Sequence, residues 1–174
     1  DWSQAVIETW SQRVGEAIDR AVGQVWLIAH SFGCLAAVTA TVGRADRVAG
    51  ALLVAPANPE RFAAHGLIAS GESSIATDTN KETITAHIPH RPLGIPAVVV
   101  ASANDPWMRL TAASVWADRW GAQFERIGRA GHINADSGFG PWPQGLSLFE
   151  RFRLAHGGHP LGSIETLHAR RFVA

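Results

Sequence analysis

The chain has 174 residues, of which 47% are hydrophobic and 17% charged, and its 15 basic side chains balance its 15 acidic ones. This length and apolar content suit one buried core, so we expect a single domain over residues 1–155, followed by a tail or appendage over residues 156–174. The basic residues are scattered and form no stripe that would favour nucleic acid. No apolar run approaches the roughly 20 residues that span a bilayer, and no charged-then-apolar leader opens the chain, so no membrane partner is predicted.

Hydrophobic periodicity predicts helices and strands in alternation. Residues 3–22 carry apolar side chains at spacings of three and four, which is typical of a helix with one buried face. Further helices are predicted over residues 32–41, before Gly121 and around residues 146–152. Short apolar runs typical of buried strands cover residues 25–29, 48–55 and 95–101, and residues 123–127 alternate like a shorter strand. This order predicts an α/β fold in which a mostly parallel sheet carries helices on both faces.

Residues 58–94 contain no comparable pattern, and their centre is rich in Gly, Ser, Thr and Asp. A loop of this length in a compact domain is usually functional or disordered. A mobile cover over a site and a surface excursion with one short helix are both compatible with the sequence.

A tight turn with a serine, Ala29-His30-Ser31-Phe32-Gly33, joins the first predicted strand to the second predicted helix. Such a turn strains the backbone of the serine, raises its hydroxyl above the edge of the sheet, and needs small neighbours. Ser31 is therefore the candidate nucleophile. Because Ala29 stands where the common G-x-S-x-G form has glycine, the pentapeptide alone is equally compatible with an ordinary helix N-cap.

Two further groups follow later predicted strands, Asp105 after residues 95–101 and His132 after residues 123–127. The carboxyl ends of parallel strands share one edge of the sheet, so both groups are expected beside Ser31. The order nucleophile, acid, histidine is that of α/β-hydrolases and predicts a catalytic triad. Taken alone, Asp105 also fits a helix start before Pro106, His132 fits a loop histidine, and Asp136 is a rival acid.

Four more motifs accompany the serine turn at residues 29–33: Asn104-Asp105-Pro106, Trp120-Gly121-Ala122, Gly131-His132-Ile133-Asn134 and Gly138-Phe139-Gly140-Pro141-Trp142-Pro143. With these motifs, most of residues 10–155 resembles the small serine hydrolases typified by retinoblastoma-binding protein nine. The resemblance implies a three-layer α/β-hydrolase fold of minimal size, with Ser31, Asp105 and His132 as the matching triad. It implies no particular substrate.

Members of that family normally begin with a strand and a Gly-rich loop that helps to form the oxyanion hole, whereas this chain opens directly into its first helix. We therefore expect the fold to lack its N-terminal strand and to keep one oxyanion donor, the backbone N–H of Phe32. Either the chain is N-terminally shortened or another backbone group supplies the second donor. Loss of one donor costs about a hundred- to a thousand-fold in turnover.

The single cysteine, Cys34, cannot form an intrachain disulfide, which agrees with a cytoplasmic location. It lies one turn past Ser31 and is expected to be a packed thiol. Two pairs of histidines lie close in the sequence, His87 with His90 and His156 with His159. Prolines or glycines interrupt them, and no carboxylate or cysteine cluster accompanies them, so no metal site is predicted, and no cofactor is predicted either.

Together these features predict a serine hydrolase that cleaves a carboxylic ester or related acyl bond of a small-molecule substrate. Trp107 and Trp142 flank the predicted catalytic loops and are expected to line the substrate pocket. The alternative is a catalytically weak module that keeps the hydrolase scaffold and binds a protein partner. The sequence does not indicate an oligomeric state.

Overall fold

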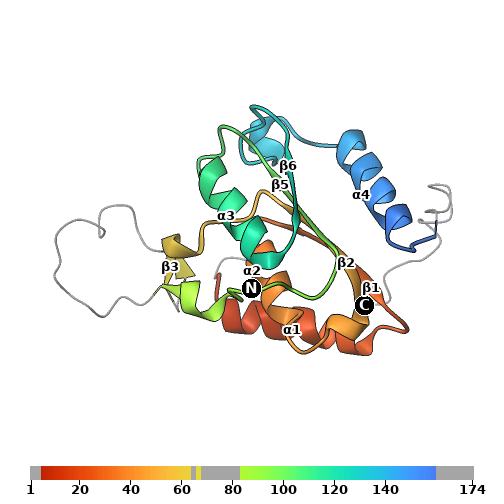
Figure 1. Cartoon of the computed structure of the whole chain (residues 1–174). Coiled ribbons are helices and arrows are strands. Elements are labelled where there is room, and N and C mark those ends of the chain that lie inside the picture. The colour runs from red at the N-terminus through yellow and green to blue at the C-terminus, as the bar shows by residue number, and fades with distance from the viewer. Residues whose placement is uncertain (1–4, 64–65, 68–82, 160–174) are drawn as a thin grey trace. The chain divides into compact units, whose positions relative to one another are not determined.

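A four-stranded parallel sheet organises the first part of the chain in the computed structural model (Figure 1). The structure describes residues 5–63, 66–67 and 83–159, which belong to two compact units, Asp1–Gly140 and Pro141–Ala174. The sheet lies in the first unit, and its strands follow the order β1, β2, β5, β6. Their bounds are β1 (Val25–His30), β2 (Val48–Val54), β5 (Ala97–Ala101) and β6 (Gln123–Arg126). The predicted domain over residues 1–155 stays a prediction.

The two central strands form the core of the sheet. Every residue of β5 is buried, and so is every residue of β2 except Ala49. In register, His30 pairs with Val54 and Val54 with Val100, so the carboxyl ends of these strands lie at one edge. Each of the four predicted strands is therefore present, with bounds that differ by one or two residues.

The two outer strands are more exposed than the central pair. In the part of the chain that the structure describes, no strand pairs with the outer edge of β1, and Ile28 on β1 is 60% exposed. Beside this edge runs an apolar groove between β1 and the helix α1, lined by Arg13, Val14, Ala17, Ile18, Val25 and Leu27.

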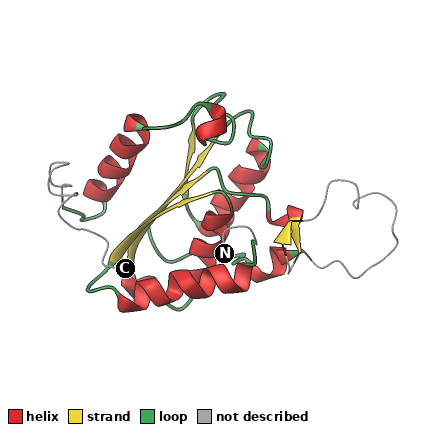
Figure 2. Cartoon of the chain, turned by 180° about the vertical axis from the view of Figure 1, so that it is seen from behind, coloured by secondary structure: helices red, strands yellow, loops and turns green. Residues whose placement is uncertain are grey.

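Among the described residues, three helices longer than a few residues accompany the sheet in the first unit (Figure 2). They are α1 (Ile7–Arg20), α2 (Phe32–Ala40) and α3 (Leu110–Trp120). Helix α1 packs against α2, α2 contacts β1, and α3 contacts β5 and β6. Seven of the nine residues of α2 are buried, because its small side chains allow close packing on both neighbours. Helix α3 ends at Gly121, whose φ of 66° is the left-handed conformation that glycine adopts most readily.

The segment from residue 58 to residue 94 differs from the expected irregular loop. It carries the single-turn helices η2 (Pro59–Arg61) and η3 (Ile84–His87) and a small antiparallel pair, β3 (Phe62–Ala63) with β4 (Gly66–Leu67). Two-residue strands are too short to give a periodic signal. Phe62 is 5% exposed, and its ring packs at a tilt against that of Phe32, with 4.9 Å between the ring centroids, which fixes this segment to α2. The predicted cover would involve residues 64–65 and 68–82, which lie outside the described residues.

The second unit contains α4 (Pro143–Ala155), which begins with a proline in its first turn. Proline is favoured there because the N–H it lacks has no partner within a helix. None of the helices in the described ranges is long and apolar enough to cross a membrane.

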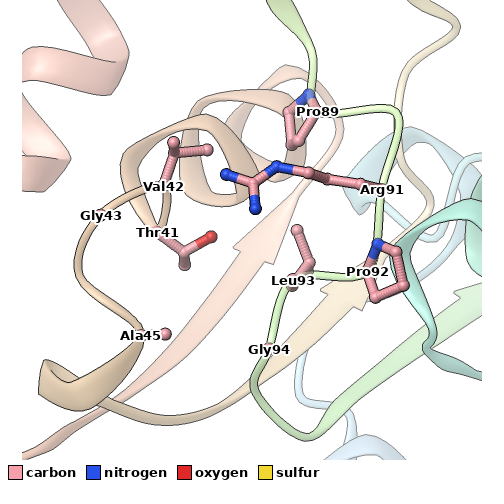
Figure 3. A pocket seen from close by; sticks show the side chains of 9 residues that line it. All are labelled: Thr41, Val42, Gly43, Ala45, Pro89, Arg91, Pro92, Leu93 and Gly94. Atoms are coloured by element: carbon pink, nitrogen blue, oxygen red, sulfur yellow. The ribbon is translucent and has the colours of Figure 1, made fainter.

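A pocket of about 190 Å³ lies at the amino-terminal edge of the sheet, between the turn after α2 and the segment before β5 (Figure 3). The Arg91 side chain extends toward Thr41 and Val42. The Thr41 hydroxyl donates to the Val38 carbonyl at 2.7 Å. This pocket is remote from the carboxyl edge, where the predicted catalytic groups lie.

Candidate active site

Ser31 occupies the sharp turn between β1 and α2. Its φ and ψ are 55° and −126°, a conformation that L-residues rarely adopt. The turn is held by backbone bonds to the end of β2, since Ser31 N–H donates to the Val54 carbonyl at 3.1 Å and Ala57 N–H donates to the Ser31 carbonyl at 3.2 Å. Ser31 holds the N-cap position of α2, but its hydroxyl makes no capping bond to the helix and therefore does not act as an ordinary N-cap.

His132 connects Ser31 to Asp105. Its Nε2 lies 2.8 Å from the Ser31 hydroxyl oxygen, and its Nδ1 lies 3.0 and 2.9 Å from the two carboxylate oxygens of Asp105. The side chains of His132 and Asp105 are 8% and 2% exposed. Three predicted residues that are far apart in the sequence are thus joined in one hydrogen-bonded chain.

Both alternative interpretations of the acid fail. Helix α3 begins at Leu110, so Asp105 does not cap it; Asp105 Oδ1 instead accepts from the Trp107 N–H at 2.8 Å. The rival acid Asp136 is exposed in the single-turn helix η4 (Ala135–Ser137) and forms no hydrogen bond to His132 within the described residues.

The hydrogen bonds assign the proton on the His132 ring. Nδ1 faces a carboxylate, which only accepts, so Nδ1 carries the hydrogen. Nε2 is then unprotonated and accepts from the Ser31 hydroxyl. This is the arrangement in which a histidine can take a proton from a serine while a carboxylate stabilises the resulting imidazolium.

A buried serine links the two loops that carry Asp105 and His132. Ser102, only 1% exposed, donates to Asn104 Oδ1 at 2.9 Å and accepts from the Ala130 N–H at 2.9 Å. Asn104 Oδ1 also accepts from the Gly131 N–H at 2.9 Å. No role was predicted for Ser102, since a serine at a strand end is common and its partner lies 28 residues away.

A second set of bonds fixes the backbone of His132. The His132 N–H donates to Ser137 Oγ at 3.0 Å, and that hydroxyl donates to Asn134 Oδ1 at 2.8 Å. The next residue, Ile133, has a φ of 50°, which is strained for a β-branched side chain. Ala55, just after β2, has a φ of 44° and donates its N–H to the Val100 carbonyl at 2.8 Å.

His30 is a site residue that the sequence analysis did not identify. Its Nε2 donates to the backbone carbonyl of His132 at 2.8 Å, and the two rings lie 4.8 Å apart. His30 is partly exposed, but the burial of its ring lowers its pKa, and the neighbouring His132 ring adds to this effect. A titratable side chain directly before a candidate nucleophile was the signal that could have identified it.

Phe32 is the first residue of α2, so its N–H is one of those without a partner inside the helix. Its ring is anchored by edge-on packing against Trp10 at 5.2 Å. The amide directly after a nucleophile is the usual position of an oxyanion donor. The assignment of Phe32 to an oxyanion hole stays a prediction.

The two tryptophans predicted to line a pocket belong to different units. Trp107 is half-buried, with its ring 6.0 Å from that of His132. Trp142 lies in the second unit, at the start of α4, where its indole contacts Gly145. The prediction that both tryptophans bind substrate stays a prediction.

The thiol of Cys34 is packed in the core as predicted. The residue is fully buried, its Sγ lies 3.4 Å from the Val54 carbonyl oxygen, and burial raises its pKa. His90 and His156 bond to backbone carbonyls in their own segments. Across the described ranges, no three His, Cys, Asp or Glu side chains gather in a way that could hold a metal ion.

Comparison with known proteins agrees with this geometry. A family model described as serine hydrolase matches residues 1–151. The crystal structure of a YdeN-like hydrolase from Pectobacterium atrosepticum is 36% identical and superposes with a TM-score of 0.69, covering 84% of this chain and 68% of that one. No curated protein matches the chain.

Two more distant structures show the fold alone. The ydeN gene product from Bacillus subtilis is 19% identical, with a TM-score of 0.56 over 84% of this chain and 74% of that one. An α/β-hydrolase enzyme from a sediment metagenome of the Mar Chica lagoon, Morocco, is 17% identical, with a TM-score of 0.60 over 86% and 71%. The predicted α/β-hydrolase fold, a parallel sheet flanked by helices, is therefore confirmed.

Proposed function

The chain belongs to the serine hydrolase family, as its motifs indicated, and on this premise we propose that it hydrolyses a carboxylic ester or related acyl bond through an acyl intermediate on Ser31. The observation that carries the proposal is the hydrogen-bonded chain from Asp105 through His132 to Ser31. A small-molecule acyl compound is the proposed substrate. The cytoplasmic location suggested by the single cysteine also stays a prediction.

The proposed reaction begins when Ser31 Oγ attacks the carbonyl carbon of the substrate and His132 Nε2 takes the hydroxyl proton. The resulting tetrahedral intermediate loses its alcohol as the ester C–O bond breaks and His132 returns the proton to the leaving oxygen. A water molecule then attacks the acyl carbon while His132 Nε2 takes its proton. The bond to Ser31 Oγ breaks, His132 returns the proton to that oxygen, and the acid is released. Asp105 stabilises the imidazolium in both halves and does not itself need to gain a proton.

We assign the Phe32 N–H to the negative oxygen of the intermediate, because it directly follows the nucleophile and has no partner inside α2. Trp107 is proposed to contact the substrate beside His132, on the basis of the 6.0 Å separation of their rings. Trp142 is proposed as a second contact from its place in the family motif.

A fluorophosphonate probe tests the assignment of Ser31, because it reacts only with a serine that a neighbouring base activates. We expect labelling of the native chain and its loss in Ser31→Ala. Ser114→Ala, which removes a partly exposed hydroxyl from α3, is the matched control and should label normally. Hydrolysis of para-nitrophenyl butyrate should follow the same pattern.

A folded native chain that neither labels nor hydrolyses the aryl ester would contradict the proposal. That result would favour the alternative, a catalytically weak module that binds a protein partner through the same scaffold. Thermal melting monitored by circular dichroism shows whether each variant is folded, so a loss of labelling is not confused with unfolding.

A further inference from the structure

An arginine lies next to the candidate active site without a role in the proposed reaction. Arg61 ends η2, and its guanidinium carbon lies 4.4 Å from the centroid of the Trp107 ring. Its Nη1 donates to the Pro106 carbonyl at 2.9 Å. Trp107 in turn lies 6.0 Å from the His132 ring, so one indole separates the cation from the catalytic histidine.

The Arg61 guanidinium keeps donors available after these contacts. A guanidinium has five N–H donors, and among the described residues one of them is used, on the Pro106 carbonyl. In the part of the chain that the structure describes, no carboxylate lies within ion-pair distance of Arg61. The neighbouring Glu60 is directed to the Asn58 side-chain amide, with its Oε2 3.5 Å from Nδ2.

The location of Arg61 indicates which part of a substrate it would meet. In the proposed reaction, His132 Nε2 delivers a proton to the leaving oxygen, so the alcohol part of the ester must lie against His132. Trp107 contacts His132, and Arg61 covers Trp107. A guanidinium that packs over an indole keeps N–H donors that can bind a carboxylate with two parallel hydrogen bonds.

We propose that Arg61 and Trp107 form a subsite for a carboxylate on the leaving alcohol of the ester. This inference rests on the proposed ester hydrolysis and adds the substrate class. Trp107 supplies an apolar surface for the alcohol, and Arg61 supplies the charge that distinguishes an anionic alcohol from a neutral one.

The test compares two esters that differ only in the charge of the leaving group, para-butyryloxybenzoate and para-butyryloxybenzamide. Their kcat/KM ratio in the native chain is compared with the ratio in Arg61→Gln. We expect the substitution to lower the anionic-to-neutral ratio by about fivefold to tenfold, a modest effect because the guanidinium is partly exposed. Using the ratio cancels any general loss of activity or of folded protein.

Arg119 provides a matched control, because its guanidinium also lies over a tryptophan, at 4.8 Å from the Trp116 ring on α3. Arg119→Gln removes the same charge and the same type of stacking at a place with no contact to His132. We expect it to leave the ratio unchanged. In the native chain, the preference for the anionic ester should also shrink as salt rises from about 0.05 to 0.5 M, since salt screens exposed charges.

Two outcomes would overturn the inference. One is a ratio that Arg61→Gln does not change, which would mean that Arg61 only fastens η2 to the Pro106 carbonyl. The other is a preference confined to an acyl-side carboxylate, tested with mono-para-nitrophenyl glutarate against para-nitrophenyl butyrate. Failure of the proposed function itself is recognised separately, because then neither the neutral ester nor the fluorophosphonate reacts.

Discussion

Replacing Gly131 by alanine should disrupt the histidine loop through one specific contact. Gly131 directly precedes His132 and has a φ of 56°. A Cβ added there would overlap Ser137 Oγ and lie 2.8 Å from Ser137 Cβ. Ser137 must therefore move, and its hydroxyl is the group that accepts from the His132 N–H and donates to Asn134.

The substitution Gly128→Ala, three residues earlier, measures how much of the lost stability comes from the backbone conformation alone. Gly128 has a φ of 67°, and a Cβ there would meet nothing within 4 Å. An alanine at either position costs about 1 to 2 kcal/mol for its left-handed backbone. Gly131→Ala additionally loses or weakens two hydrogen bonds, which adds about 1 to 3 kcal/mol. For a chain of this length, that difference corresponds to a melting temperature roughly 2 to 12 °C lower than in Gly128→Ala.

The two variants are compared by thermal melting and by hydrolysis of para-nitrophenyl butyrate. Because a displacement of about 1 Å at the reacting groups can cost on the order of a hundred-fold in rate, we expect kcat of Gly131→Ala to fall at least about tenfold below that of Gly128→Ala. Equal melting temperatures and equal kcat in the two variants would refute the reasoning, since they would show that Ser137 does not hold His132.

Three other substitutions test the surroundings of the site. Ser102→Ala leaves the buried Ala130 N–H without its acceptor, so the free energy of unfolding in urea should fall by about 1 to 3 kcal/mol and kcat should also fall. Thr41→Val removes an equally buried hydroxyl far from the site and should leave kcat unchanged. Equal effects of the two substitutions on kcat would contradict this. Asp105→Asn should lower ester hydrolysis by about ten-thousand-fold, because an amide no longer favours the hydrogen on Nδ1, and near-native turnover would rule out Asp105 as the acid. The pKa of His30 is lowered in the folded chain, so below its unfolded value of about 6.5 the unfolded chain binds more protons. The stability from His30 is therefore present above that pH and lost as pH falls through it, and His30→Gln should melt with a weaker pH dependence between about pH 7 and 5; identical slopes would contradict this.

The succession of helices and strands along the chain and the three linked residues could be predicted because their signals are local. Ser31, Asp105 and His132 each follow an apolar run, and parallel strands bring such positions to one edge. The predicted ends of a strand were less accurate where a single residue determines where the strand begins. The strand expected over residues 95–101 begins at Ala97, because Pro96 has no N–H to donate to a neighbouring strand.

The supporting contacts could not be predicted, because they depend on distances in space that the sequence does not encode locally. His30 and the His132 carbonyl are 102 positions apart, and Arg61 and Pro106 are 45 apart. Each of these side chains resembles an ordinary polar surface residue when its neighbours in sequence are considered alone. Only the folded chain shows that His30 bonds to the loop of His132 and that Arg61 bonds to the loop of Asp105.

Among the residues that the structure describes, three that are not glycine have a positive φ, namely Ser31, Ala55 and Ile133, and all three lie at the carboxyl edge of the sheet or in the His132 loop. Strain of this kind costs on the order of 1 to 3 kcal/mol per residue and persists only where the surrounding bonds impose it. Selection for stability alone would replace such residues by glycine, so their retention suggests a trade-off between stability and activity. Ala55 has no side chain that could react, which makes Ala55→Gly the first substitution to try in a search for a more heat-resistant form that keeps its chemistry.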